Sequence, residues 1–437
     1  MPHVPINPST DGVPTMALTT VQELQTLIQQ KIRQKMPQSN LLNQLENTEK
    51  IAIVQSVGRV LAQDVISPLN VPNANVSAMD GYALPQAAAA GSRWKVGGIS
   101  AAGHAFEGSL HSENECVRIM TGAVVPRGMR TVVLQENVEL LEENDEQYIV
   151  LKQNAEERSN IRYAGEEITQ GAIVLHRGRI LREADVLLLA SLGLDSVSVF
   201  RKIRVAVLST GDELRDPGTP LDGSDKIYDS NRYMLMARLQ SLPIEVIDLK
   251  KVDDDLESVM RVLESAMRSA DVVISSGGVS VGDFAYLREA VLRLGAIHHY
   301  KVAIKPGKPF VFGQMGQTWY FGLPGNPISG YVGLDIFLKS ALWQLCGAEE
   351  TQIPQPLRFE AVLSAPVKKA PGRMDIQRAL ITQAQDGSWQ AAPCGPQDSH
   401  RVLGISQANA YLILSLESGP LAAGERVTVQ PFLETFL

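Results

Sequence analysis

Cysteine is scarce in this 437-residue chain, and the three cysteines, Cys116, Cys346 and Cys394, lie far apart in the sequence. No CxxC pair occurs, so we expect neither a disulfide framework nor a zinc site. The seven histidines show no metal-ligand spacing, and no Ser-His-Asp arrangement is recognisable. The usual nucleotide fingerprints, the Walker A loop and GxGxxG, are also missing.

Long apolar runs and blocks of like charge are absent as well. The longest markedly apolar stretch, Val186–Leu194, is far too short to span a membrane. The net charge is −8, from 40 basic and 48 acidic residues, and the longest run of one sign is Asp253–Asp255. This balance disfavours nucleic-acid and membrane partners. The first residues lack the apolar segment of a signal peptide, so we expect a cytoplasmic protein.

Strand and helix patterns divide the chain. Short apolar runs alternate with helical patterns over 201–350, which predicts a doubly wound, mainly parallel α/β domain. Short β-like runs between glycine-rich turns predict a β-rich domain at 71–162 and a small β-barrel or sandwich at 354–437. Thr20-Val-Gln-Glu23 has the spacing of a capping box before one helix. A second helical pattern runs from Ile51 to Leu61.

One glycine-rich loop follows a predicted buried strand of the α/β region. Val272–Ile274 leads into Ser275-Ser-Gly-Gly-Val-Ser-Val-Gly282, and a helical pattern starts at Tyr286. Such a loop presents backbone N–H groups and hydroxyls at the carboxyl edge of the sheet, where phosphates and other oxyanions bind. By itself, however, a Gly/Ser turn is more often only a tight connection.

Three further loops of the α/β region carry similar chemistry: Ser209-Thr-Gly-Asp-Glu213, Lys305-Pro-Gly-Lys308-Pro309 and Gly325-Asn326-Pro327. Their hydroxyls, ammonium groups and helix start predict an anion site, to which Arg378 adds a planar fork. Acidic residues lie on other loops, namely Asp80, Glu213, Asp254 and Asp283. Carboxylates beside a phosphate loop favour Mg²⁺, so the residues predict a Mg²⁺-assisted enzyme acting on a phosphoanhydride or nucleotide.

Two motifs within the β-rich region and one at its end are not explained by strand alternation: Ser77-Ala-Met-Asp80-Gly-Tyr-Ala, Met120-Thr121-Gly-Ala and Asn160-Ile-Arg162. For either of the first two motifs by itself, an ordinary Asp-Gly or Thr-Gly turn is the more frequent explanation. For the third, a solvated salt-bridge loop is the simpler explanation.

Seven sequence motifs resemble those of the molybdenum insertase family, and they occur in the same order along the chain. This family includes the bacterial MoeA proteins and the E domain of gephyrin. They are Ser77–Ala83, Met120–Ala123, Asn160–Arg162, Ser209–Leu214, Ser276–Gly282, Lys305–Pro309 and Gly322–Pro327. The resemblance covers about residues 50–437.

The resemblance implies a homodimer whose subunits have four domains. An elongated discontinuous domain would comprise 18–70 and 163–200, followed by the β-rich inserted domain, a MogA-like molybdopterin-binding α/β domain and a C-terminal β-barrel. The implied reaction inserts molybdate into adenylylated molybdopterin, with Mg²⁺-dependent release of AMP and formation of molybdenum cofactor. A molybdopterin adenylyltransferase and molybdoenzyme acceptors are then possible partners.

The family's functional positions carry over residue by residue. Positions implicated in binding molybdate and the pterin phosphate match Lys301, Lys305, Lys308, Pro309, Arg378 and Ser399. Positions around the metal and adenylate match Glu213, Asp254 and Ser280, and the loops add Ser276, Gly277, Gly278 and Asn326 as binding residues. Positions on the opposite wall, facing the second subunit, match Asp80, Thr121 and Arg162.

One departure from the family pattern concerns the metal. The family usually has an acid where this chain has Ala285, whereas Asp283 stands two residues earlier. Either Asp283 replaces that ligand, or the chain is a catalytically impaired dimeric scaffold of the gephyrin type. A molybdopterin adenylyltransferase is a third reading, although such an enzyme would not need the motifs in the two β regions.

Overall fold

The computed structural model describes residues 18–35, 47–278 and 286–432. The chain forms two compact units. The first unit contains the chain up to Glu49, the short segment Gly58–Val60 and the chain from Val199 onward. The second unit contains Lys50–Val57 and Leu61–Ser198.

A six-stranded sheet is the centre of the first unit. Its order is β16 (Ile244–Val252), β13 (Ile203–Thr210), β17 (Val272–Ser276), β21 (Thr318–Leu323), β20 (Pro309–Met315) and β18 (Gly295–Lys301). The first four strands are mutually parallel, and β20 is antiparallel to both of its neighbours. The predicted mainly parallel sheet is therefore confirmed, with an additional antiparallel strand, β20, that the sequence analysis did not predict.

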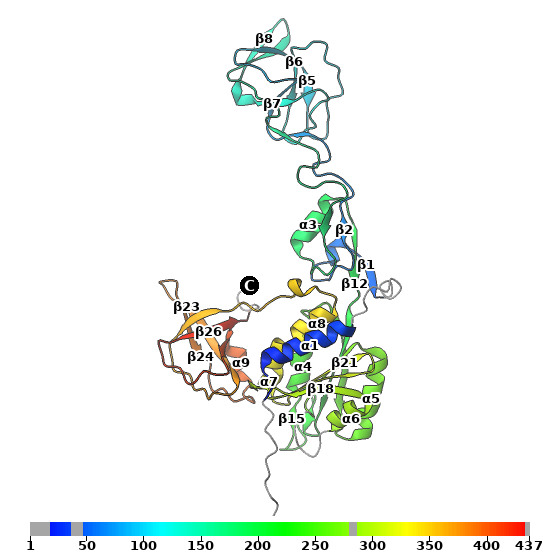
Figure 1. Ribbon diagram of the computed structural model, residues 1–437, viewed down its shortest axis with the longest axis vertical. Helices are drawn as coiled ribbons and strands as arrows, with labels where there is room; N and C mark the ends of the chain where they lie inside the picture. The colour runs from blue at the N-terminus through cyan, green and yellow to red at the C-terminus, as the bar shows by residue number, and fades with distance from the viewer. Residues whose placement is uncertain (1–17, 36–46, 279–285, 433–437) are drawn as a thin grey trace, which may run out of the picture. The chain divides into compact units, whose positions relative to one another are not determined.

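Helices cover both faces of this sheet (Figure 1). Helices α5 (Leu256–Ser269) and α6 (Tyr286–Leu294) pack together and share an apolar core with the strands. The other helices of the α/β layer are α1 (Val21–Lys35), α4 (Ser230–Leu239), α7 (Pro327–Gly333) and α8 (Lys339–Leu345). Among these, α4 packs on α7 and β13, and α1 packs on α8.

The starts of the helices follow local side-chain chemistry. The Thr20 backbone N–H donates to Glu23 Oε2 at 2.8 Å, and the Glu23 N–H donates to Thr20 Oγ1 at 3.2 Å, which confirms the predicted capping box. Asp255 accepts from the N–H of Ser258 at the start of α5. Asp229 accepts from the N–H of Arg232 at the start of α4. Each carboxylate satisfies a donor that the helix itself leaves free.

A π-helical segment, Leu334–Leu338, lies between α7 and α8. Asp335 in this segment accepts from Arg238 on α4 at 2.6 Å and from the phenol of Tyr411 at 2.9 Å. Tyr411 is fully buried, and burial raises the pKa of its phenol, so the phenol stays a donor. Asp335 thus connects α4 of the α/β layer with a strand of the C-terminal barrel.

The C-terminal region is a closed five-stranded barrel. Of the two predicted alternatives, a barrel and a sandwich, the barrel is therefore confirmed. Its strands are β22 (Phe359–Leu363), β23 (Met374–Gln383), β24 (Trp389–Pro393), β25 (Ala410–Leu414) and β26 (Arg426–Pro431). Pairing of β23 with β25 closes the barrel around an apolar core. A two-residue strand from the α/β region, β19 (Ile304–Lys305), adds to β23 in parallel. A short helix, α9 (Leu403–Gln407), precedes β25.

The second unit contains the predicted β-rich domain. Its six-stranded sheet comprises β4 (Gly81–Leu84), β5 (Arg93–Ser100), β6 (Glu115–Ile119), β7 (Thr131–Leu134), β8 (Val138–Glu143) and β9 (Glu146–Leu151). The remaining regular elements of this unit include β2 (Val65–Ile66), β3 (Val76–Ser77), β10 (Ile161–Arg162), β11 (Ile173–Leu175) and α3 (Glu183–Ser191). Buried side chains form one apolar cluster around Trp94 and another around Val117.

The helix expected from Ile51 to Leu61 is absent, and that prediction was wrong. The segment forms the end of β1 (Thr48–Ala52) and the 3₁₀ turn Ile53–Gln55. Most of its apolar residues are β-branched, which disfavours a helix. Gly58 follows with φ of 77°, and Val54 is 76% exposed, so the apparent periodicity does not mark a buried helix face.

Helix α1 contacts the last helices of the α/β layer. The side-chain amide of Gln25 donates to the carbonyl of Ile336 at 2.8 Å, and that of Gln344 donates to the carbonyl of Gln29. Both contacts join α1 to the last helices of the α/β layer, so α1 belongs to the first unit. Over the described ranges, no helix has the length and apolar content that crossing a membrane requires.

Candidate functional site

The glycine loop after β17 requires glycine at two successive positions. Strand β17 is fully buried between β13 and β21, and it is followed by Gly277 and Gly278, whose φ values are 88° and 65°. A Cβ on Gly277 would lie 2.8 Å from the carbonyl oxygen of Thr210. A Cβ on Gly278 would lie 2.6 Å from Leu287 Cδ1. Glycine is therefore required at both positions, because of the positive φ and because a Cβ would lie too close to neighbouring atoms.

Replacing Gly278 with alanine should distort this loop. We expect Gly278→Ala to lower the free energy of unfolding by about 1–3 kcal/mol, because the new side chain combines a left-handed φ with a steric clash. Chemical denaturation measures the change. Gly325→Ala is the matched control, since its Cβ would meet its nearest neighbour at an ordinary 3.7 Å. Equal stability of the two variants would contradict the expectation.

The loop borders a cavity of about 700 Å³ at the carboxyl edge of the parallel strands. The end of β13 contributes Thr210, the loop after it contributes Gly211 and Glu213, and Asp254 follows β16. The start of α4 contributes Asp229, Ser230 and Asn231, and the turn between β21 and α7 contributes Pro324, Gly325, Asn326 and Pro327. His400, from the C-terminal region, completes one side of the lining.

Many of the predicted site residues meet in this cavity: Glu213, Asp254, Ser276, Gly277, Gly278, Pro309 and Asn326. Ser280 and Asp283 lie outside the described residues, as does Ala285. Lys301, Lys305, Lys308, Arg378 and Ser399 do not belong to the described lining. Ser399 lies beside it, because its carbonyl accepts from the N–H of Ile328 at 3.1 Å.

Acidic residues give one side of the cavity its electrostatic character. Burial raises the pKa of the Asp254 carboxyl, and the neighbouring Asp212, Glu213 and Asp255 raise it further. Mutual repulsion of this kind favours a bound proton or cation. No group of three or more His, Cys, Asp or Glu side chains suited to a metal is present among the residues that the structure describes. A cation here would have to draw its remaining ligands from elsewhere.

The lysine loop lies where the α/β layer joins the barrel. Lys305 Nζ is 3.2 Å from Asp375 Oδ2 on β23 and remains about half exposed. Lys301 Nζ lies 5.3 Å from the centre of the Tyr300 ring. Lys301 and Lys308 are exposed. The proposed molybdate role of these lysines stays a prediction.

Arg378 is buried rather than presented to solvent, with an exposed fraction of 1%. Its guanidinium donates to the backbone carbonyls of Pro396, Asp398 and Arg401, and burial lowers its pKa. Arg378 therefore organises the loop that carries Ser399 and His400. In this arrangement its contribution to the cavity is to position that loop.

Three predicted site residues, Asp80, Thr121 and Arg162, lie in the second unit. The Thr121 N–H and hydroxyl both donate to Asp80 Oδ1, at 2.6 and 2.8 Å. These two bonds, the backbone bond first, lower the pKa of the Asp80 carboxyl and keep it ionised. Arg162 is exposed on β10, opposite Val76 of β3. Asp80 and Thr121, from two separate segments, are thus joined in one exposed, hydrogen-bonded anionic group, and their predicted role at the site stays a prediction.

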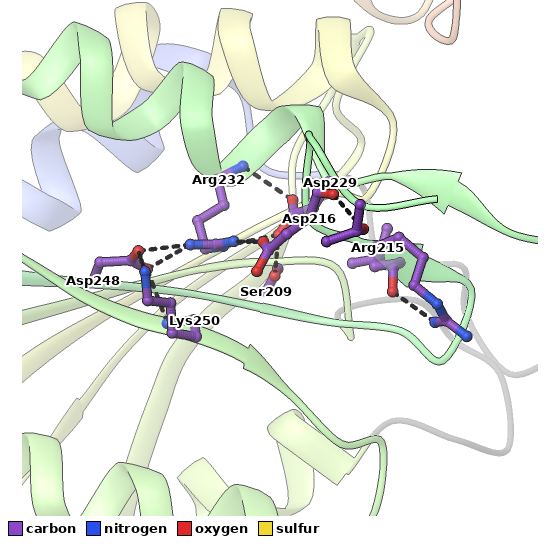
Figure 2. A network of polar contacts seen from close by, with 9 residues as sticks. Ser209, Arg215, Asp216, Asp229, Arg232, Asp248 and Lys250 are labelled. Carbon is purple, nitrogen blue, oxygen red and sulfur yellow. Dashed lines mark hydrogen bonds and ion pairs between the residues drawn. The ribbon is translucent and has the colours of Figure 1, made fainter. Parts of the chain in front are cut away.

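A polar network around Arg232, near the cavity, was not predicted from the sequence (Figure 2). Arg232 on α4 has no exposed side-chain surface, and its guanidinium contacts Asp216, Asp229 and Asp248. Asp229 also accepts from the hydroxyl of Ser209 at 2.5 Å. Burial acts to lower the pKa of Arg232, but Asp229 and Asp248 outweigh it and raise the pKa. Arg232 thereby fixes the loop after β13 and the start of α4, both of which line the cavity.

Known proteins resemble this chain along nearly its whole length. Sequence models of the MoeA N-terminal region (domains I and II), of a probable molybdopterin-binding domain and of the MoeA C-terminal region (domain IV) match residues 19–193, 206–344 and 360–432. A molybdopterin molybdenumtransferase from Haemophilus influenzae is 38% identical over 398 residues, which cover 90% of this chain and 97% of that relative.

A Bacillus subtilis protein of the same name is 33% identical over 390 residues, covering 87% of this chain and 89% of the relative. Among solved structures, a molybdopterin biosynthesis MoeA protein from Pyrococcus horikoshii OT3 superposes with a TM-score of 0.77 at 26% identity. That superposition covers 95% of this chain and all of the archaeal chain.

Proposed function

The chain belongs to the MoeA family, and we propose that it is a molybdopterin molybdenumtransferase that inserts molybdate into adenylylated molybdopterin and releases AMP. The observation that carries the proposal is the cavity at the carboxyl edge of the α/β sheet. It combines a glycine loop suited to an oxyanion with carboxylates suited to a cation, as cleavage of an adenylate requires.

The proposed cation is Mg²⁺, held by Glu213 and Asp254. The raised pKa of Asp254 supports this assignment, because a cation relieves the repulsion among the neighbouring carboxylates. Mg²⁺ commonly takes only one or two protein carboxylates and completes its coordination with phosphate oxygens and water. Its contribution when bound is to neutralise charge on the phosphoanhydride. Asp283 stays a predicted additional ligand.

We also propose that the chain acts as a homodimer. Support comes from the second unit, where the 3₁₀ turn Ile53–Gln55 and α3 are in contact and each exposes an apolar side chain. Val54 is 76% exposed and Leu187 is 74% exposed. Large exposed apolar side chains on neighbouring elements favour a protein partner, here a second copy. Sedimentation or light-scattering mass tests this directly, and a monomer at working concentration would contradict it.

The activity is tested with purified protein, adenylylated molybdopterin, molybdate and Mg²⁺. We expect release of AMP together with cofactor that reconstitutes a molybdoenzyme. An AMP concentration no higher than in a reaction without protein would contradict the proposal. A dimer that shows no turnover would favour the interpretation of the chain as a catalytically impaired scaffold. Consumption of ATP with free molybdopterin would favour the adenylyltransferase reading instead.

A further inference from the structure

Asn231, in the first turn of α4, has an unusual hydrogen-bonding state. The residue is 93% buried, with an exposed fraction of 7%, and it lines the cavity. Its side-chain Nδ2 donates to Ser276 Oγ and to the carbonyl oxygen of Gly325, both at 2.8 Å. These two bonds use both amide hydrogens and tie the start of α4 to the glycine loop and to the turn before α7.

The orientation of this amide is fixed by chemistry. If the amide were turned over, its oxygen would face the Gly325 carbonyl, which can only accept a hydrogen bond. Two acceptors would then be opposed at hydrogen-bonding distance. Oδ1 must therefore point away from Gly325 and Ser276, and it is buried without a partner among the described residues. A buried amide oxygen without a donor is an exception in folded proteins and calls for an explanation.

We propose that Asn231 is a specificity-determining residue whose Oδ1 accepts a hydrogen bond from an N–H or O–H group of the ligand in this cavity. The inference rests on the proposed function and goes further, because it orients the substrate. A phosphate offers chiefly acceptors and would be repelled by Oδ1. The neutral, donor-bearing part of the substrate, a nucleoside or pterin group, therefore binds at Asn231, and the phosphates lie elsewhere in the cavity.

The test compares several ligands on several variants of the full-length protein. Calorimetry measures the dissociation constant of each ligand for each variant. One arm compares AMP with purine riboside monophosphate and with 2′- and 3′-deoxy-AMP, each of which lacks one nucleoside donor. The other arm compares pterin with 4-hydroxypteridine, which lacks the exocyclic amine. The variants are wild type, Asn231→Ala and Asn409→Ala. Asn409 is a matched control, because its amide pairs with the backbone of Ile381 in the barrel and is absent from the cavity lining.

We expect wild type and Asn409→Ala to bind one donor-deficient ligand about tenfold more weakly than its parent, as loss of one buried hydrogen bond predicts. In Asn231→Ala this discrimination should fall to within about twofold, and the arm in which it falls identifies the nucleoside or the pterin as the donor. Discrimination that persists in Asn231→Ala, or an equal loss for every ligand, would overturn the proposal and leave Asn231 a structural residue.

The same measurements separate this inference from the function on which it rests. Wild-type protein that releases AMP from adenylylated molybdopterin, yet discriminates equally with and without Asn231, would overturn only the role of Asn231. Wild-type protein that neither releases AMP nor binds any of these ligands would overturn both. Thermal unfolding of each variant shows whether the altered protein is folded before its binding is interpreted.

Discussion

Arg232→Met is expected to lower the free energy of unfolding of the α/β region by about 3–5 kcal/mol, the usual cost of removing one partner from a buried ion pair. The variant keeps most of the side-chain volume but removes the charge that Asp229 and Asp248 face. Asp229 is 2% exposed, so water cannot replace the guanidinium. Urea denaturation measures the loss in the free energy of unfolding. Hydrogen exchange of the backbone amides in β13 and β16 shows whether the loss lies in this part of the sheet.

Arg261→Met provides the comparison for this prediction. Arg261 lies on α5 with 71% of its side chain exposed and pairs with Glu257 at 3.6 Å. An exposed pair of this kind contributes about 0–1 kcal/mol, so little change is expected. Adding Asp229→Asn to Arg232→Met should recover part of the lost stability, because it removes the uncompensated buried charge. Equal stability of Arg232→Met and Arg261→Met would contradict the interpretation of Figure 2.

Asp254→Asn is expected to reduce AMP release by about 10²–10³-fold, the size of effect seen when one group that stabilises reaction charge is lost. The same variant should be no less stable than wild type, and its Tm should rise by about 1–2 °C. The reason is the sign of the pKa shift. A carboxyl whose pKa is raised on folding opposes the folded state once it is ionised, and that unfavourable contribution disappears in the amide.

The pH dependence of wild-type activity follows from the same shift. Asp254 retains its proton to a higher pH than an ordinary aspartate, and only the carboxylate binds a cation well. AMP release should therefore increase as the pH rises through the acid range, with the Mg²⁺ requirement greatest at low pH. Asp253→Asn is the control, since Asp253 is 75% exposed and outside the cavity lining. Wild-type turnover in Asp254→Asn would remove this residue from the proposed cation site.

Local sequence patterns predicted much of the fold because their causes are local. Helix α5 is one of the helices of the α/β region predicted over 201–350, where Asp255 satisfies the first turn and apolar residues recur on one face. The glycine loop was recognisable because only glycine fits at Gly277 and Gly278. The failed helix from Ile51 to Leu61 marks the limit of periodicity, which cannot tell a buried face from exposed β-branched residues.

The unpredicted parts of the site depend on partners distant in sequence. Arg232 is 16 residues from both Asp216 and Asp248, and only Asp229 is a local neighbour. Arg378 could be seen as a cation, but not as one enclosed by three backbone carbonyls. No role was predicted for Asn231. In each case the role of the residue depends on contacts between segments that are distant in the sequence. Local secondary-structure propensity does not predict such contacts.

The contact between Asp335 and Tyr411 bears on how far this chain is modular. Cutting the chain before Pro354 would remove the phenol from Asp335, the strand beside β19 and the Ser399 carbonyl that accepts from Ile328. His400 would also be lost from the cavity. The α/β layer and the barrel therefore depend on each other structurally. Recombination that exchanged one without the other would have to rebuild all of these junctions at once.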